Sequence, residues 1–315
     1  MIEVKNLTKR YGNHCAVDNI SFHADEGEIL GFLGPNGAGK STTMNILTGY
    51  LSATDGTVTI NGYDILEHPN KAKVNIGYLP EQPPLYRDMT VKEYLDFMYD
   101  LKKCPLPRKR HLDEICKVMK IEDVYGRLIK NLSKGYQQRV GMAQALIGNP
   151  PVLILDEPTV GLDPNQVIEI RSLIKTLGKH HTVILSSHIL SEIEAVADRI
   201  VIINNGKIVA DDTAENLSNA MSEDRRMLVS VAGPEKEVAN LIAGIKGVER
   251  VTIMANKATG VSDYAITTAE DVDIRRELFS RLAKRDWPLL SSKSLAMSLE
   301  DIFIHITLKE NGGNR

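Results

Sequence analysis

Cysteine and long apolar runs are scarce in this sequence of 315 residues. Its three cysteines, Cys15, Cys104 and Cys116, have no C-x-x-C spacing, so neither a disulfide framework nor a zinc knuckle is indicated and a reducing cytoplasm fits best. The longest apolar runs, such as 152–155 and 200–203, are far shorter than the ~18 residues that a membrane span requires. The first residues lack the order of a signal peptide. We therefore expect a chain that neither crosses a membrane nor is exported.

An excess of charge of either sign is also missing, because 38 Lys+Arg stand against 41 Asp+Glu, a net charge of −3. Nucleic acid or an anionic membrane as the main partner would normally require a basic surplus. We therefore expect neither as the main partner. What the sequence does have is 43% hydrophobic residues, enough for a sizeable core, and a length that suggests about two domains.

The first two thirds of the chain carry the pattern of an α/β domain. Short β-rich runs are expected at 2–7, 16–22, 29–33 and 57–60, separated by polar or glycine-containing turns. The periodicity then becomes helical from about 85 to 147. From residue 152 onward strands and helices alternate, at 152–155, 167–177, 182–186, 190–197 and 199–203. This alternation predicts a parallel sheet covered by helices.

The pattern changes after about Asp212, where the charged string 222–226 has no apolar periodicity. We place the boundary there, with one domain over 1–222 and a small C-terminal α+β domain over 223–315. In the second domain we expect strands at 227–231, 248–255, 261–267 and 287–291, with helices at 235–245 and 271–284. This order resembles a split β-α-β, ferredoxin-like unit. A closing helix is expected from Ser298, with Asp301 completing a capping box.

A glycine-rich segment matches the phosphate-loop pattern G-x-x-x-x-G-K-[ST], between the strand at 29–33 and a helix. Its residues are Gly34, Pro35, Asn36, Gly37, Ala38, Gly39, Lys40, Ser41 and Thr42. Glycines let the backbone wrap a phosphate chain with its N–H groups inward, and the helix N-terminus adds a positive dipole end. Lys40 would reach the β- and γ-phosphates, and the Ser41 hydroxyl would ligate Mg²⁺. The alternative is a glycine-rich turn that only starts a helix.

The apolar run at 152–155 ends in two adjacent carboxylates, Asp156 and Glu157. A strand buried on both faces has this composition, and its carboxyl end lies at the edge where ligands bind in open α/β sheets. Asp156 would complete the Mg²⁺ shell, and Glu157 would orient and deprotonate the attacking water. Taken alone, a solvated acidic turn before Pro158 explains the pair equally well.

Three further motifs stand in order around this acidic strand: Leu-Ser-Lys-Gly-Tyr-Gln-Gln-Arg at 132–139, Gly-Leu-Asp-Pro at 161–164, and His188. With the phosphate loop they resemble the ATPase subunit of an ATP-binding cassette (ABC) transporter over about residues 1–210. Ser-Leu-Glu-Asp-Ile-Phe at 298–303 is similar to the extension on ATPases that serve ABC-2-type permeases. The resemblance implies a P-loop NTPase fold of ABC type, with a β-subdomain and an inserted helical subdomain at about 85–147.

The resemblance also implies that ATP and Mg²⁺ are bound and that two such subunits, identical or different, pair head to tail. Ser133 and Gly135 would contact the γ-phosphate held by the partner subunit. Tyr11 would stack on adenine, Asp163 would couple the two sites, and His188 would contact the γ-phosphate and the transition state. Without the resemblance, Tyr11 would be a packed aromatic at a strand end, and His188 a satisfied surface histidine.

The sequence departs from the family pattern in two places. The usual signature L-S-G-G-Q has Lys134 and Tyr136 at two of its positions, whereas Ser133 and the phosphate-contacting glycine remain. The second departure is in the loop where a Gln normally touches Mg²⁺. Counting back from Met-Thr-Val at 89–91 puts Glu81, rather than Gln82, at that position. Either residue is competent, because a carboxylate is a hard ligand for Mg²⁺.

The resulting hypothesis is an ATPase that dimerises on ATP and powers a separate integral-membrane permease of ABC-2 type, in the export direction. It would be cytoplasmic and attached to the inner face of the cell membrane through that permease. One alternative is a soluble cassette ATPase acting in translation or DNA maintenance, although the sequence has one cassette, no heptads and no basic surplus. Another is a regulatory module whose C-terminal domain senses a ligand.

Overall fold

The computed structural model describes residues 2–220, 226–258, 260–269 and 272–294. The chain divides into two compact units, 1–214 and 215–315. The sequence-based boundary after 222 lies on the far side of α8 (Ala214–Ala220), nearly all of which groups with the second unit. The charged string marks where the apolar pattern changes, whereas the contacts of the chain change before that helix. We call residues 1–214 the first unit and residues 215–315 the second unit, and describe each by itself.

The central sheet of the first unit has six strands. Their order is β10 (Lys207–Asp212), β9 (Arg199–Asn204), β3 (Ile29–Leu33), β8 (Thr182–Ser187), β7 (Val152–Asp156) and β6 (Ile76–Leu79). All neighbours are parallel except β10, which pairs antiparallel with β9 at one edge. Strands β3, β7 and β8 are buried along their whole length, which explains their continuous apolar sequences. The predicted parallel sheet is confirmed.

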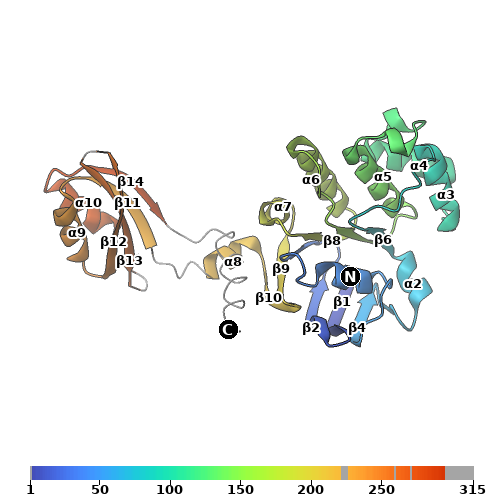
Figure 1. Ribbon diagram of the computed structural model, residues 1–315, viewed down its shortest axis with the longest axis horizontal. Coiled ribbons are helices and arrows are strands. Elements are labelled where there is room, and N and C mark those ends of the chain that lie inside the picture. Colours follow the sequence, from blue (N-terminus) through green and yellow to red (C-terminus); the bar gives the residue numbers. More distant parts are fainter. Residues whose placement is uncertain (1, 221–225, 259, 270–271, 295–315) are drawn as a thin grey trace. The chain divides into compact units, whose positions relative to one another are not determined.

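A second, antiparallel sheet packs near the first (Figure 1). Its order is β2 (His14–Ala24), β1 (Ile2–Tyr11), β4 (Asp55–Ile60) and β5 (Tyr63–Asp64). Helix α1 (Lys40–Leu47) contributes Met44 and Leu47 to a core that also contains Val4 of β1 and Ile154 of β7. The phosphate loop is therefore anchored at both ends, by β3 before it and by this core after it.

The helical region inserted into the first unit contains three α-helices, with two 3-10 turns between the second and the third. These are α3 (Val91–Leu101), α4 (Arg108–Met119), η1 (Glu122–Val124), η2 (Ile129–Asn131) and α5 (Lys134–Leu146). Helix α5 approaches β6 so closely that a Cβ on Gly77 would lie 2.3 Å from the Ala145 carbonyl oxygen. Helices α2 (Pro69–Val74), α6 (Pro164–Gly178) and α7 (Leu190–Glu194) complete the unit. In the described part of the chain, no helix has the length and apolarity that a membrane crossing demands.

The second unit has the element order that the sequence indicates. After α8, its described elements are β11 (Arg226–Ala232), α9 (Glu235–Ala243), β12 (Val248–Ala258), β13 (Val261–Thr268), α10 (Arg275–Ala283) and β14 (Leu289–Ser294). The antiparallel sheet runs β12-β13-β11-β14. Both helices pack on one face, where Val229 and Tyr264 of the sheet meet Ile242 and Leu278. The closing helix predicted from Ser298 lies outside the described residues.

Candidate functional site

The phosphate-loop segment forms a tight turn between β3 and α1. Gly37 and Gly39 have φ angles of 82° and 111°, in the left-handed region that glycine adopts without strain. A Cβ on Gly34 would lie 2.4 Å from the Ile203 carbonyl oxygen, so the loop also needs glycine for close packing on β9. The helix begins at Lys40, and its first N–H groups lack partners within the helix. The turn is thus built to present backbone N–H groups to an anion.

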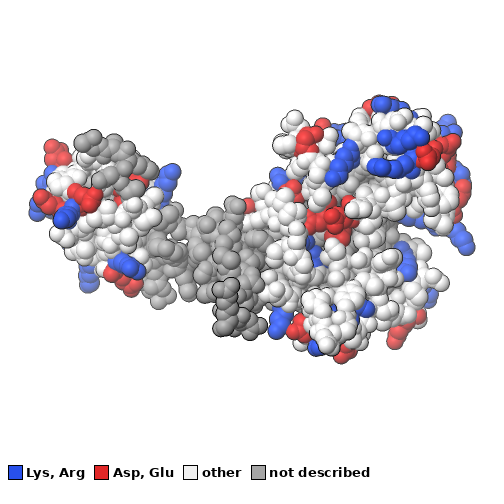
Figure 2. Space-filling model, viewed as in Figure 1, with Lys and Arg blue, Asp and Glu red and all other residues white. Residues whose placement is uncertain are grey.

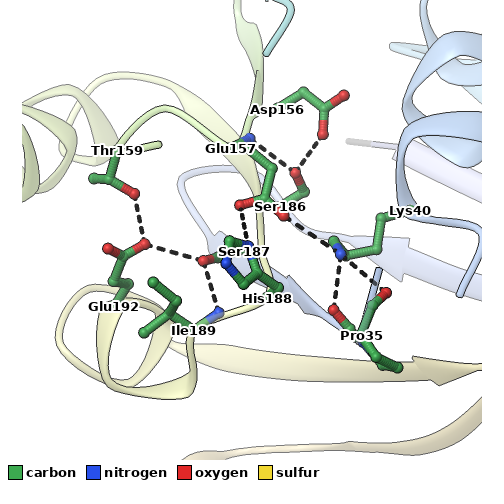
Figure 3. A network of polar contacts seen from close by, with 11 residues as sticks. Pro35, Lys40, Asp156, Glu157, Thr159, Ser186, Ser187, His188, Ile189 and Glu192 are labelled. Carbon is green, nitrogen blue, oxygen red and sulfur yellow. Dashed lines mark hydrogen bonds and ion pairs between the residues drawn. The ribbon is translucent and has the colours of Figure 1, made fainter. Parts of the chain in front are cut away.

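The side chain of Lys40 folds back over its own loop. Its Nζ donates to the Gly34 carbonyl at 2.7 Å and to the Pro35 carbonyl at 3.2 Å, and it lies 3.4 Å from Glu157 Oε1 (Figure 3). Lys40 is only 6% exposed. A buried ammonium held by two carbonyls and a carboxylate is a strong local positive charge at a preset position.

The carboxylates at the end of β7 are held by Ser186 of the neighbouring strand β8. The Ser186 hydroxyl donates to Asp156 Oδ1 at 2.5 Å and accepts from the Glu157 N–H at 3.0 Å. Burial raises the pKa of the Asp156 carboxyl, hydrogen bonds from Ser186 and Ser41 oppose that rise, and the charges of Glu157 and Glu81 add to it. Asp156 is therefore a buried acid under electrostatic stress from its neighbours.

Glu157 follows the strand in a conformation that is unusual for a residue with a side chain. Its φ is 48°, in the left-handed region that costs roughly 1–2 kcal/mol for such residues. Its Oε2 lies 2.9 Å from His188 Nδ1, and the other oxygen faces Lys40. Glu157 is 5% exposed, whereas the His188 side chain is 38% exposed. The carboxylate is thus fixed between a cation and an imidazole at the edge of the sheet.

These groups surround a cavity of about 530 Å³, which we call the phosphate-loop cavity. It is lined by Tyr11, His14, Ala16, Asn36, Gly37, Gly39, Lys40, Ser41, Thr42, Glu81, Glu157, Val160 and His188. Of the two residues that the sequence left as alternatives, Glu81 belongs to this lining and Gln82 does not. Tyr11 is 47% exposed, so its ring is not packed away. Gly34, Pro35, Ala38 and Asp156 support the lining without forming part of it.

The signature segment lies elsewhere, at a second cavity of about 550 Å³ that we call the signature cavity. It is lined by Lys120, Glu122, Asp123, Ser133, Gly135, Tyr136, Arg139, Gln166 and Glu169. The two cavities have no lining residue in common. Within one chain, the fold therefore does not bring Ser133 and Gly135 to the phosphate loop.

The signature segment starts helix α5, with Ser133 as its N-cap. The Ser133 hydroxyl accepts from the Tyr136 N–H at 3.4 Å, and the Tyr136 hydroxyl donates to Asp123 Oδ2 at 2.7 Å. The Arg139 guanidinium lies 5.6 Å from the Tyr136 ring centre. A Cβ on Gly135 would lie 2.8 Å from the Gln166 side chain. Tyr136, one of the departures from the family pattern, is thus held to its own chain.

Asp163, expected from the resemblance to couple two sites, caps α6 in this structure. Its Oδ1 accepts from the Gln166 N–H at 3.0 Å. It lines neither of the two cavities.

Sequence reasoning missed a polar network behind Glu157 and His188, formed by Thr159, Ser187 and Glu192 (Figure 3). One signal was available: the apolar run of β8 ends in Ser186 and Ser187, just as β7 ends in two carboxylates. Polar residues at the carboxyl ends of neighbouring parallel strands meet at one edge of the sheet. Glu192 had no such signal, because it lies in a short helix.

Known proteins share this fold and these motifs. The family model described as ABC transporter matches residues 17–160. An ABC transporter ATP-binding protein of Bacillus subtilis, YxlF, is 32% identical over 97% of this chain and 99% of its own length. The linearmycin resistance ATP-binding protein LnrL of Bacillus subtilis is 32% identical over 98% of each chain. The bacitracin transport ATP-binding protein BcrA of Bacillus licheniformis is 37% identical over 69% of this chain and 71% of its own.

Solved structures agree with these relatives. The dimeric structure of a bacterial ABC transporter cassette covers 68% of this chain and 98% of its own, with 29% identity and a TM-score of 0.62. A post-hydrolysis structure of the same cassette with ADP and Pi has 28% identity and a TM-score of 0.61 over the same shares. The fold and the phosphate-loop cavity define a P-loop ATPase. More particularly, the chain belongs to the ATP-binding proteins of ABC transporters, as the sequence motifs predicted, and it is an ATPase subunit.

Proposed function

We propose that this protein hydrolyses ATP to power a separate membrane permease of ABC-2 type, in the export direction. The names of its relatives, which include bacitracin and lantibiotic transport proteins and a linearmycin resistance protein, support transport of this kind. The observation that carries the catalytic part is the buried contact set of Glu157 with Lys40 and His188 at the phosphate-loop cavity.

ATP binding follows from the phosphate loop. Its N–H groups and the start of α1 would surround the phosphates, and the Lys40 ammonium would exchange its present contacts for the β- and γ-phosphate oxygens. The half-exposed ring of Tyr11 offers a face on which adenine would stack. The cavity volume of about 530 Å³ suits a ligand of nucleotide size.

Hydrolysis follows from the position of Glu157. A water molecule in line with the γ-phosphate would lose its proton to the Glu157 carboxylate as its oxygen attacks phosphorus. The bond to the β-phosphate oxygen then breaks, and Lys40 would stabilise the charge that develops on that oxygen. His188 would hold the carboxylate in place through its Nδ1 contact and touch the γ-phosphate.

The residues present also fit Mg²⁺. Ser41, Asp156 and Glu81 would hold it with hard oxygen atoms. Burial and the neighbouring carboxylates raise the pKa of Asp156, and a cation bound there would offset this repulsion by stabilising the ionised carboxylate. Within the described residues, no group of three or more His, Cys, Asp or Glu forms a metal site by itself. A site with so few protein ligands is typical of Mg²⁺ that is also coordinated by the phosphates of a substrate. When bound, the ion would supply charge neutralisation for the β- and γ-oxygens.

Pairing of two subunits would complete each site. The signature cavity offers the start of α5 at Ser133 and Gly135, where N–H groups and the helix dipole favour an anion. In a head-to-tail pair, this helix start would meet the γ-phosphate bound by the other subunit, and Asp163 would lie near the junction. The pair would attach to the cytoplasmic side of the membrane through the permease.

A soluble cassette ATPase of translation or DNA maintenance has less support. Figure 2 shows Lys and Arg interspersed with Asp and Glu on the face drawn, not a continuous basic surface. Recovery of a co-purifying membrane protein with several spans from detergent-solubilised membranes would favour transport. Recovery of ribosomes or DNA instead would favour the alternative.

The substitution Glu157→Gln tests the catalytic proposal. The amide keeps the shape but accepts no proton from water, so we expect turnover to fall by about 10²–10⁴-fold while ATP is still bound. MgATP should then trap a dimer, measured by size exclusion with light scattering. Glu26→Gln, at an exposed carboxylate outside both cavities, serves as the control. Wild-type hydrolysis in the Glu157→Gln protein would remove Glu157 from the mechanism.

A further inference from the structure

Behind the phosphate-loop cavity lies a buried carboxylate to which the proposed mechanism gives no task, Glu192 in α7. It is only 7% exposed and does not line the cavity. Its Oε2 accepts from the Thr159 hydroxyl at 2.5 Å and from the Ser187 hydroxyl at 3.0 Å (Figure 3). A buried carboxylate is costly, and neutral hydroxyl donors do not cancel its charge. Such a group contributes little to stability, so its role must be sought in the two hydroxyls that it joins.

Each of these hydroxyls belongs to a loop that carries a site residue. Thr159 lies two residues after Glu157, in the loop between β7 and α6. Ser187 ends β8 and directly precedes His188. The Ser187 hydroxyl also accepts from the Ile189 N–H at 3.0 Å, so the backbone turns around His188 with the hydroxyl proton directed at Glu192. One carboxylate therefore links the loop after Glu157 to the loop that contains His188.

This link continues a first one that lies closer to the sheet. There the Ser186 hydroxyl joins Asp156 to the N–H of Glu157. Glu157 itself is strained, with φ at 48°, and such a conformation persists only where the surroundings hold it. The hydroxyl of Ser186 holds the residue on the strand side, and Glu192 holds the chain on the loop side through Thr159. Between these two links, the Glu157 and His188 side chains meet at 2.9 Å.

We propose that Glu192 is a positioning residue for ATP hydrolysis, whose carboxylate fixes the loop after Glu157 against the loop of His188. This rests on the proposed function, in which Glu157 accepts the proton of the attacking water. Without the common acceptor, the two hydroxyls lose their shared partner and the Glu157–His188 contact loses its fixed geometry. The hydrogen bonds of Glu192 go to Thr159 and Ser187 and not to Lys40 or the phosphate loop, so we expect nucleotide binding to stay intact.

The test measures kcat and KM of the full chain with MgATP for Glu192→Ala, Glu192→Gln and wild type. We expect Glu192→Ala to lower kcat by about 10- to 100-fold, the usual range for residues that orient a site from behind, and to leave KM within about threefold. Glu192→Gln, which keeps one acceptor oxygen, should fall between the two. Glu194→Gln, on the same helix but exposed, is the matched control and should retain wild-type kcat.

A second background separates positioning from loss of structure. In His188→Ala the contact with Glu157 is already absent, so adding Glu192→Ala should lower kcat by less than about threefold more. If adding Glu192→Ala to the His188→Ala protein lowers kcat by the same factor as it does in wild type, the two residues act independently and the proposal is overturned. A change confined to KM, or a kcat within twofold of wild type, would overturn it as well.

Thr159→Val and Ser187→Ala keep the test open if Glu192→Ala does not fold. Each removes one donor and leaves the carboxylate in place, and each should lower kcat by several-fold. Wild-type kcat in both would refute the proposal. Glu157→Gln, assayed in the same series, distinguishes the two levels: full activity there defeats the catalytic function itself, whereas an inactive Glu157→Gln beside an active Glu192→Ala defeats only the role of Glu192.

Discussion

The two cavities of the first unit are similar in volume, about 530 and 550 Å³, but they differ in how far their charged side chains are shielded from water. In the phosphate-loop cavity Lys40 and Glu157 are 6% and 5% exposed, and Glu81 is the exposed charged residue of the lining. In the signature cavity four of the five charged lining residues are exposed to solvent, namely Lys120, Glu122, Asp123 and Glu169, and Arg139 is partly buried. Charges shielded from water interact strongly, whereas exposed ones are screened by water and salt.

This difference assigns different tasks to the two cavities. The phosphate-loop cavity holds a cation and a carboxylate at fixed positions, which is what stabilisation of a transition state requires. The signature cavity offers a helix start and a serine hydroxyl, which under the proposed function would bind an anion without chemistry of their own. One cavity would perform the reaction, and the other would close it from a second subunit.

The largest effect is expected from Lys40→Ala compared with Lys134→Ala, one lysine beside each cavity. Lys40 is buried against two carbonyls and Glu157, so its loss removes several charge-assisted contacts to phosphate and should weaken ATP binding by about 100-fold or more. Lys134 is exposed, and its loss should change ATP binding to the single chain by less than about threefold. Isothermal titration with ATP measures both. An equal loss of ATP affinity in both variants would contradict the proposed division of tasks between the two cavities.

Mixing two inactive variants tests whether the cavities act across a pair. Gly135→Ala adds a methyl group that points at the flexible end of Gln166, another residue of the signature-cavity lining, so the fold should accept it while the methyl obstructs the cavity; Lys40→Ala disables the other cavity. Each variant alone should lose turnover. In a head-to-tail mixed pair, one site has both halves intact, so the mixture should regain a fraction of wild-type turnover, up to about one quarter for random pairing with one active site in half of the pairs. A mixture as inactive as its components would contradict pairing across the cavities.

The smallest effect is a pH dependence of stability caused by Asp156. Burial raises the pKa of this carboxyl in the folded state, so the fold favours the protonated form and its contribution to stability is lost as pH rises through the folded pKa. Asp156→Asn, which stays neutral, should therefore unfold at a temperature a few degrees above wild type at pH 7 without nucleotide. The gain should shrink as pH falls, because Asp156 then takes up its proton and becomes neutral as well.

Calorimetry of both proteins from pH 4 to pH 8 measures this difference. Ser186→Ala has the opposite effect, because it removes a hydrogen bond that lowers the pKa of Asp156. The stability of this variant should therefore depend on pH more steeply than that of wild type. A constant difference between Asp156→Asn and wild type across the pH range would contradict the electrostatic explanation.

Local patterns in the sequence were sufficient for much of the fold. The continuous apolar runs of β3, β7 and β8 indicated a buried parallel sheet, and the element order of the second unit followed from strand and helix periodicities. Strand β6 was not predicted, because Gly77 and Tyr78 interrupt its apolar pattern. Gly77 is there for α5, whose backbone approaches too closely for any side chain. That requirement comes from a segment far along the chain.

The candidate site divides in the same way. The phosphate loop could be predicted residue by residue, since its chemistry lies in nine consecutive positions, 34–42. Asp156 and Glu157 could be predicted from their place at a strand end. The position of Glu81 beside these carboxylates, and of Tyr136 against Asp123, could not, since both depend on how separate segments pack.

The sequence by itself determined that this protein is an ATPase of the ABC type, because phosphate binding and the acidic strand end are encoded by short contiguous motifs whose backbone geometry is local. The tertiary structure alone decided how the catalytic groups are held. Glu192 joins hydroxyls that lie 33 and 5 residues away in the chain. Glu157 meets Lys40 and His188 only because β8 lies between β3 and β7 in the sheet. Side-chain hydrogen bonds of this kind require the donor and acceptor to be placed to within a few tenths of an ångström. Packing sets these positions, and no linear motif records them.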